Sequence, residues 1–189
     1  MNIIVTGTSK GIGYSIVENL CKENDCKIIG IARSMERLQQ LKGKCEQWNP
    51  KSRFIPLSYD LTKILEEYKN IENEILNHVN QVDILINNAG YLVNKPFEMI
   101  STAEIDQVIN TNYKSVAIFI KMLLPLFKQK AHVVNIGSMG GFQGSSKFPG
   151  LSFYSSSKAA LANLTECLAA EFPREKVSFN CLALGAAQT

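Results

Sequence analysis

Residues 3–13 read Ile-Ile-Val-Thr-Gly-Thr-Ser-Lys-Gly-Ile-Gly, a short apolar run followed by a turn with glycines spaced Gly-x-x-x-Gly-x-Gly. The run is typical of a buried strand, and the apolar residues that follow it have helical spacing. Glycines let the backbone turn tightly and approach a phosphate group, while the free amides at the start of the helix favour an anion. The stretch therefore predicts a strand–turn–helix unit that binds the pyrophosphate of a dinucleotide.

The same alternation of apolar runs and helical patterns continues along the chain. We expect strands over residues 3–5, 27–32, 53–58, 82–86, 132–136 and 177–184. The helices between them include a long one capped by Thr62 and reaching Val79, one opened by a capping box at Ser101 and Glu104 and reaching Leu123, and one over 154–172. Apolar strands each followed by a helix indicate a parallel sheet covered on both faces. The predicted fold class is α/β, a doubly wound parallel sheet of the Rossmann type with at least six strands, forming a single domain over 1–189 with ligands at the carboxyl ends of the strands.

Composition excludes several classes of protein. The net charge of +3 and the absence of a basic run argue against a nucleic-acid partner. The chain shows neither a signal-peptide pattern nor a long apolar segment, so we expect a cytoplasmic protein without a membrane partner. The five cysteines lack metal-type spacing and the two histidines are isolated, so we expect reduced thiols and no metal site.

The residue after the second predicted strand bears on the choice of cofactor. In sites selective for NAD, an acidic residue about 20 positions beyond the glycine turn binds the ribose 2′-hydroxyl. Arg33 occupies that place here, and Lys10 lies within the turn itself. Two cations favour a 2′-phosphate, so we expect NADP(H) in preference to NAD(H). The alternative is that both are solvated surface charges.

Tyr154 and Lys158 are four residues apart in the last predicted helix and share one of its faces. An isolated tyrosine has a pKa of about 10 and is a poor acid or base at neutral pH. A neighbouring ammonium stabilises the phenolate, which makes the pair a candidate for proton transfer to or from a carbonyl oxygen. The spacing alone also occurs by chance in many surface helices.

Two further polar residues are candidates for the same site. Ser138 lies just beyond the fifth predicted strand, where its hydroxyl could donate to a substrate oxygen or bond the backbone of a turn. Asn112 shares the apolar face of its predicted helix, so its amide needs buried partners. A structural bridge and a role in a proton relay are both compatible with that position.

Together these residues resemble the short-chain dehydrogenase/reductase family, and the match covers essentially the whole chain. The family motifs Thr-Gly-x-x-x-Gly-x-Gly and Asn-Asn-Ala-Gly are matched at residues 6–13 and 87–90, and its Asn, Ser and Tyr-x-x-x-Lys positions at Asn112, Ser138, Tyr154 and Lys158. The resemblance implies hydride transfer between a nicotinamide and a carbonyl or alcohol carbon. It implies that Tyr154 moves the proton, Lys158 assists it and binds the nicotinamide ribose, Ser138 positions the substrate oxygen, and Asn112 helps to hold a relay water.

The resemblance also implies a set of cofactor-binding residues. They are Gly7, Ser9, Lys10, Gly11, Ile12, Gly13, Arg33, Asp60, Leu61, Asn88, Ala89, Gly90, Tyr154, Lys158 and Thr189. Two departures stand out: Leu184 replaces the proline that usually precedes Gly185, and family members usually continue beyond the position of Thr189. That continuation often forms a subunit interface, so we expect a homodimer or homotetramer if such a segment exists.

These observations predict an NADP(H)-dependent oxidoreductase similar to 3-oxoacyl-carrier-protein reductases and carbonyl reductases, with a small carbonyl compound or secondary alcohol as substrate. The alternative is a non-catalytic dinucleotide-binding redox sensor on the same fold. The aromatic residues of the loop over 140–153 could line an apolar substrate pocket or simply anchor the loop.

Overall fold

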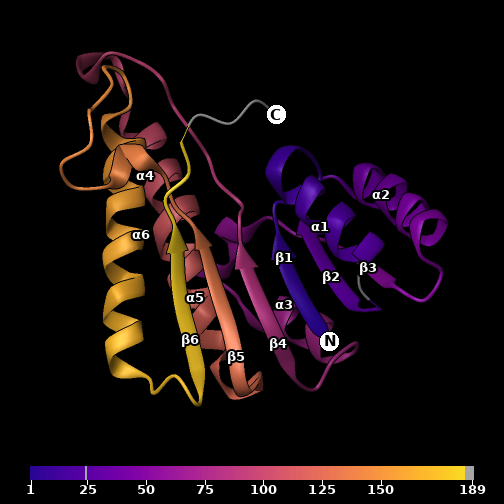
Figure 1. The fold of residues 1–189 in the computed structure, drawn as a ribbon. Helices are drawn as coiled ribbons and strands as arrows, with labels where there is room; N and C mark the ends of the chain where they lie inside the picture. The colour runs from indigo at the N-terminus through magenta and orange to yellow at the C-terminus, as the bar shows by residue number, and fades with distance from the viewer. Residues whose placement is uncertain (24, 186–189) are drawn as a thin grey trace.

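Six parallel strands form one sheet at the centre of the computed structural model, which describes residues 1–23 and 25–185 (Figure 1). The strands are β1 (Asn2–Thr6), β2 (Lys27–Ala32), β3 (Arg53–Ser58), β4 (Val82–Asn87), β5 (Phe127–Ile136) and β6 (Val177–Leu182). Their order across the sheet is β3-β2-β1-β4-β5-β6. The chain winds outward from β1 to β3 and then returns to β4 beside β1, so the winding direction reverses between β1 and β4. This order confirms the predicted doubly wound α/β fold, in which ligands bind at the carboxyl ends of the strands beside that reversal.

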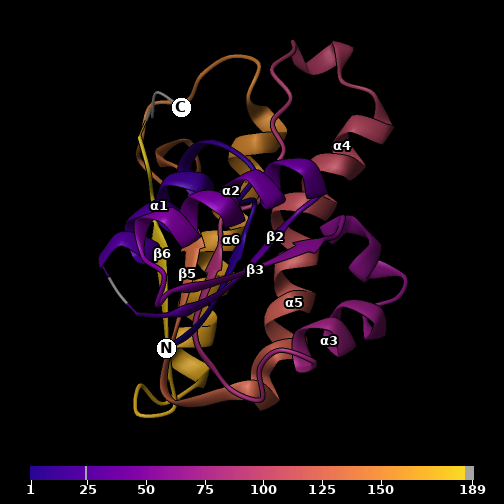
Figure 2. The same cartoon turned by 90° about the vertical axis from the view of Figure 1, so that its right-hand side faces the viewer.

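Helices cover both faces of the sheet. They are α1 (Gly11–Glu23), α2 (Met35–Trp48), α3 (Lys69–Leu76), α4 (Thr102–Ile109), α5 (Ser115–Leu123) and α6 (Ser152–Glu171). Figure 2 shows α1 and α2 on one side of the sheet and α3 and α5 on the other. Alternate strand residues point to opposite faces, so Ile3 and Val5 pack in the core beneath α1 and α2 while Ile4 packs in the core beneath α3 and α5. Within the described residues, no helix has both the length and the apolar character needed to cross a bilayer.

The prediction of one long helix between Thr62 and Val79 is wrong, because the chain forms two shorter helices there, a 3₁₀ helix followed by α3. A 3₁₀ helix, η1 (Leu61–Leu65), begins after Asp60, whose carboxylate accepts hydrogen bonds from the Thr62 backbone at 3.0 Å and the Thr62 hydroxyl at 2.8 Å. Asp60, rather than Thr62, is therefore the cap. The apolar periodicity runs across the break because Ile64 and Ile71 pack into the same core.

Two strand boundaries differ from the prediction by more than one residue. β5 begins at Phe127 rather than at residue 132, because Phe127 already pairs with Val82 of β4. The polar, exposed residues 128–130 lie at a register shift between that pair and the pairing of His132 with Ile84. β6 ends at Leu182 rather than at residue 184, because its partner Ile136 is the last residue of β5. Beyond that point Leu184 no longer has a ladder neighbour, and its carbonyl accepts a hydrogen bond from the Met139 backbone at 2.8 Å.

The helix predicted from Ser101 to Leu123 is present but interrupted. The capping box is confirmed, since the Ser101 hydroxyl accepts from the Glu104 backbone at 3.3 Å and the Glu104 carboxylate accepts from the Ser101 backbone at 3.0 Å. Between α4 and α5 the chain forms one π-helical segment, η3 (Asn110–Lys114). Asn112 lies in that segment with none of its surface exposed. Such segments inside α-helices gather at functional sites.

A short polar layer crosses the core where β4, β5 and α6 meet. The Asn87 amide donates to the Asn135 side-chain oxygen at 2.8 Å, and the Asn135 amide donates to the Thr165 hydroxyl at 2.9 Å. All three side chains are buried. Because buried polar groups are costly unless they are paired, these bonds align the two strands and the helix with one another.

Candidate active site

The glycine turn after β1 has the backbone conformation that its sequence demands. Gly7 and Gly11 have φ values of +75° and +59°, in the left-handed region that side chains disfavour. A Cβ atom at Gly13 would lie 2.3 Å from the Gly7 carbonyl oxygen, so only glycine fits there. The backbone of Gly13 thus packs against the carbonyl of Gly7 within the turn. The helix α1 begins at Gly11 and has no acidic residue in its first turn. The positive end of α1 is therefore available to an anion.

Asn88 joins this turn to the end of β4. Its side-chain amide donates to the carbonyl oxygens of Thr6 at 3.1 Å and Gly7 at 3.2 Å. In return, the Thr6 hydroxyl accepts hydrogen bonds from the backbones of Asn88 and Ala89, each at 3.0 Å. These four bonds hold β1 and β4 together at the point where the winding of the sheet reverses.

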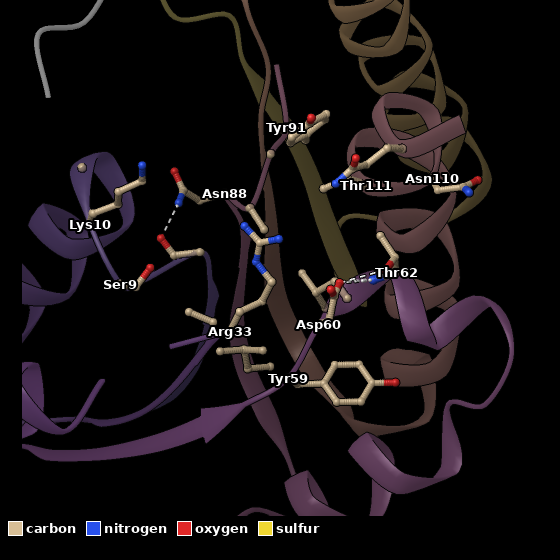
Figure 3. A pocket seen from close by; sticks show the side chains of 18 of the residues that line it. Ser9, Lys10, Arg33, Tyr59, Asp60, Thr62, Asn88, Tyr91, Asn110 and Thr111 are labelled. Carbon is tan, nitrogen blue, oxygen red and sulfur yellow. Dashed lines mark hydrogen bonds between the residues drawn. The ribbon is translucent and has the colours of Figure 1, made fainter. Parts of the chain in front are cut away.

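A groove of about 850 Å³ opens beside this junction. It is lined by Gly7, Ser9, Lys10, Gly11, Ile12, Arg33, Asp60, Leu61, Asn88, Ala89 and Gly90 from the predicted cofactor set, and by Tyr59, Tyr91, Asp106, Asn110 and Thr111 among residues that were not predicted. Figure 3 shows Asn110 and Thr111 across the groove from Ser9 and Lys10. The predicted residue Thr189 lies outside the described part of the chain.

Two cations stand at one end of the groove. Arg33 follows β2 and Lys10 precedes α1, and both side chains are exposed. Figure 3 shows the Arg33 guanidinium reaching into the groove between Lys10 and Asp60. Oδ1 of Asp60 accepts both hydrogen bonds from Thr62, as the cap of η1, and among the described residues no ion pair joins Asp60 to either cation.

Lys158 does not line the groove itself but lies beside Gly90, which does, and it is almost entirely buried. Its ammonium donates to the Ile136 carbonyl at the end of β5, at 2.7 Å, and lies 5.9 Å from the centroid of the Tyr154 ring. A Cβ atom at Gly90 would be 3.7 Å from the Lys158 nitrogen, which places the ammonium beside the floor of the groove. Burial lowers the pKa of Lys158 to about 8, because desolvation disfavours its charged form. The Lys158 ammonium and the Tyr154 ring therefore face each other, although neither residue lines the groove.

Ser138 bonds the backbone of its own turn, which was one of its two predicted roles. It caps the 3₁₀ helix η5 (Met139–Gly141), and its hydroxyl oxygen accepts from the Gly140 backbone at 3.2 Å. The bond occupies a lone pair of the oxygen and orients the side chain. The hydroxyl hydrogen remains available as a donor, so the turn bond and a contact with a substrate oxygen are compatible.

The side chain of Asn112 is a structural bridge. Its oxygen accepts from the Tyr91 backbone at 2.8 Å, and its amide donates to the Tyr91 carbonyl at 2.9 Å and to the Ser157 hydroxyl at 3.0 Å. The spacing of Asn112 left a structural bridge and a role in a proton relay open, and the side-chain amide acts as the bridge. Tyr91 and Ser157 were not predicted from the sequence. Tyr91 directly follows the Asn-Asn-Ala-Gly motif and Ser157 directly precedes Lys158, and these positions were the only indication that either belongs to the site.

The donor set of the groove fits a nicotinamide dinucleotide. The glycine turn and the start of α1 present backbone amides for a pyrophosphate, while Arg33 and Lys10 supply positive charge for further phosphate. Beside Gly90, the Lys158 ammonium adds a buried positive charge that faces the Tyr154 ring. Among the described residues, no group of three or more His, Cys, Asp or Glu side chains could hold a metal ion.

Comparison with known proteins agrees with this geometry. The family model described as short chain dehydrogenase matches residues 1–189. An oxidoreductase of Staphylococcus saprophyticus is 34% identical over 171 residues, covering 89% of this chain and 66% of its own length. The chain spans 62–66% of the length of this relative and of three other curated relatives.

Solved structures share the fold at similar levels of identity. A short-chain dehydrogenase from Streptomyces avermitilis superposes with a TM-score of 0.85 at 31% identity, over all of this chain and 66% of the other. A short-chain dehydrogenase from Burkholderia cenocepacia, solved in complex with NADP, superposes with a TM-score of 0.85 at 25% identity, over 96% of this chain and 72% of the other.

Proposed function

Because the chain belongs to the short-chain dehydrogenase family, we propose that it is an NADP(H)-dependent oxidoreductase that interconverts a small carbonyl compound and the corresponding alcohol. The observation that carries the proposal is the buried ammonium of Lys158, held at 2.7 Å by the Ile136 carbonyl and facing the Tyr154 ring beside the groove. Burying an ammonium without a carboxylate partner costs free energy of folding, and such groups with perturbed pKa values gather at functional sites.

When bound, the nicotinamide supplies a hydride to the carbonyl carbon or accepts one from the alcohol carbon. Tyr154 then delivers or removes the proton on the oxygen. With a pKa of about 8, Lys158 is largely protonated at neutral pH, so its charge stabilises the phenolate that forms as Tyr154 gives up its proton. Ser138, oriented by the Gly140 backbone, donates its hydroxyl hydrogen to the same substrate oxygen as negative charge grows there.

The preference for NADP(H) rests on charge at the adenosine end. Arg33 and Lys10 are the residues that would meet a ribose 2′-phosphate, and the nearby Asp60 carboxylate is bonded to Thr62 rather than directed at a ribose hydroxyl. Solved neighbours include a complex with NADP and a complex with NAD, so the proposed preference rests on these two cations alone.

Replacement of Tyr154 by phenylalanine tests the chemistry. We expect turnover of a panel of ketones with NADPH to fall by about 10²- to 10⁴-fold, the usual contribution of a positioned acid or base, with NADPH affinity nearly unchanged. Tyr68→Phe, at an exposed tyrosine before α3, is the matched control and should retain wild-type turnover. Unchanged turnover in Tyr154→Phe would reject the assignment, and NADPH binding by the wild type without turnover of any ketone would favour the redox sensor.

Replacement of both cations tests the cofactor preference. Charge-assisted hydrogen bonds contribute about 1.5–3 kcal/mol each, so Lys10→Ala with Arg33→Ala should weaken NADPH binding by about 10²-fold or more. NADH binding should change little, because it lacks the 2′-phosphate. Lys51→Ala, at an exposed lysine in the turn before β3, is the control. Equal losses for the two cofactors, measured by fluorescence titration, would show that Arg33 and Lys10 do not select between them.

A further inference from the structure

Ser157 is a buried serine in the helix that carries the reactive pair. It precedes Lys158 on α6, and none of its surface is exposed. Its hydroxyl donates to the Tyr154 carbonyl at 2.7 Å and accepts from the Asn112 amide at 3.0 Å. The hydroxyl therefore links the backbone of the reactive tyrosine to a different element of the fold.

The other end of this link is the floor of the groove. Asn112 uses its remaining side-chain bonds on the backbone of Tyr91, one as acceptor at 2.8 Å and one as donor at 2.9 Å. Tyr91 lines the groove, and its neighbour Gly90 approaches Lys158. An unbroken path of hydrogen bonds thus runs from the groove floor through Asn112 and Ser157 to the backbone of Tyr154.

Apart from this link, the first turn of α6 is held by side-chain packing, in which the Phe153 ring stacks on Phe97 with ring centroids 5.6 Å apart. The N-cap position of α6 is Leu151, and no side chain caps the helix. Uncapped first turns leave backbone amides without partners and fray more readily than the helix interior. Tyr154 is the third residue of α6, so its position depends on whatever holds that turn in place.

We propose that Ser157 is a positioning residue, which sets the place of Tyr154 relative to the floor of the groove by joining the first turn of α6 to Asn112. The inference rests on the proposed function, because it assigns no separate chemistry to Ser157. A serine that only filled space could be replaced by alanine without consequence for Tyr154. A positioning serine could not, because alanine breaks both bonds and leaves the Asn112 amide without its contact on α6.

The test compares Ser157→Ala with two controls on the same helix. Ser156→Ala removes an exposed hydroxyl next to it. Thr165→Val removes a buried hydroxyl about two turns farther along, which accepts from Asn135 and has no bond to the Tyr154 region. Thr165→Val therefore reports what a loss of stability in α6 does by itself.

Turnover is expressed per NADPH-binding site, counted by fluorescence titration, so that unfolded protein does not contribute. We expect kcat per site to fall by about tenfold in Ser157→Ala, with the dissociation constant of NADPH within about twofold of wild type. The primary deuterium isotope effect on kcat, measured with NADPH deuterated at the transferred position, should equal or exceed that of wild type. Ser156→Ala and Thr165→Val should keep the wild-type kcat per site.

Wild-type kcat per site in Ser157→Ala would overturn the inference and leave the proposed function intact. A fall of the same size in Thr165→Val would also overturn it, since helix stability alone would then explain the loss. Absence of turnover in the wild type would reject both the proposed function and this inference. If Ser157→Ala does not fold, Ser157→Thr, which keeps the hydroxyl, should retain kcat per site, while Ser157→Cys, a weaker donor, should lower it; equal values in the two variants would count against the inference.

Discussion

Lys158 is the least exposed of the charged residues that the structure describes. Only 4% of its surface is exposed, and its charge is offset by one carbonyl, that of Ile136, rather than by a carboxylate. The Cys181 thiol is also close, and burial raises its pKa, so it stays neutral beside the lysine. The protein therefore keeps an incompletely compensated cation beside the groove, which is unfavourable for folding and useful only to a negative partner.

This cost makes the stability of the protein depend on pH. Lys158 has a folded-state pKa of about 8 and an unfolded value of 10.5, so between these pH values the unfolded chain binds a proton that the folded chain has released. Stability must therefore rise with pH in this range. The free energy of unfolding of the wild type relative to Lys158→Met should increase by about 3 kcal/mol from about pH 7 to about pH 11.

Denaturant titrations of the two proteins at each pH measure that difference. Subtracting the Lys158→Met values removes the titration of groups that the two proteins share. A difference that stays constant over the range would show that Lys158 keeps its ordinary pKa in the folded protein. A difference that falls with pH would show a pKa raised by an unseen acidic partner.

Among the elements, η5, which Ser138 caps, packs directly against α6, which carries Tyr154 and Lys158. Gly141, the last residue of η5, lies directly against the backbone of α6. A Cβ atom there would be 2.7 Å from the Ala159 nitrogen and 2.8 Å from the Lys158 carbonyl carbon. Backbone atoms inside a helix cannot move aside as a flexible side chain can, so a larger residue must push the turn away from the helix.

Gly141→Ala should therefore move the turn that Ser138 caps away from the helix that carries Tyr154 and Lys158. We expect a loss of about 1–3 kcal/mol in stability from overpacking, and a loss of turnover larger than that of NADPH binding. Gly43→Ala, within α2, is the control, since a Cβ atom there meets nothing within 4 Å. It should raise stability by up to about 1 kcal/mol, as alanine favours the helix. Wild-type turnover in Gly141→Ala would show that η5 can shift without disturbing the site.

The element level is also where the sequence was partly misleading. The apolar stripe through Ile64 and Ile71 is real, but it is shared by η1 and α3, and periodicity does not reveal the break between them. The π segment around Asn112 was missed for a similar reason, because one added residue alters the spacing of apolar side chains too little to be noticed. Capping residues were more informative, as the Ser101 and Glu104 box shows, since they act through local geometry.

At the scale of the whole molecule, the sequence predicted the sheet and the place of the groove. The alternation of strands and helices indicates a doubly wound parallel sheet, and the glycine turn marks the edge where ligands bind. The strand order β3-β2-β1-β4-β5-β6 came from the structure alone. The bonds inside the site were less accessible. Nothing in the local sequence tells that Lys158 donates to Ile136 or that Asn112 bonds Tyr91, because those partners come from elements that only the fold brings together.

The buried amides of Asn87 and Asn135 have a consequence for the accuracy of that assembly. In strands that are apolar on both faces, a buried polar side chain adds a requirement on the register that apolar packing alone does not make, because the polar group needs one particular partner. A slip of β5 by one residue would turn the Asn135 amide away from Thr165 and strand it in hydrocarbon. A misaligned arrangement of β4, β5 and α6 therefore has a higher free energy than the native one, because it leaves buried amides without partners. Residues that do not line the groove thus help to align the strand that carries Ile136 with the helix that carries Tyr154 and Lys158.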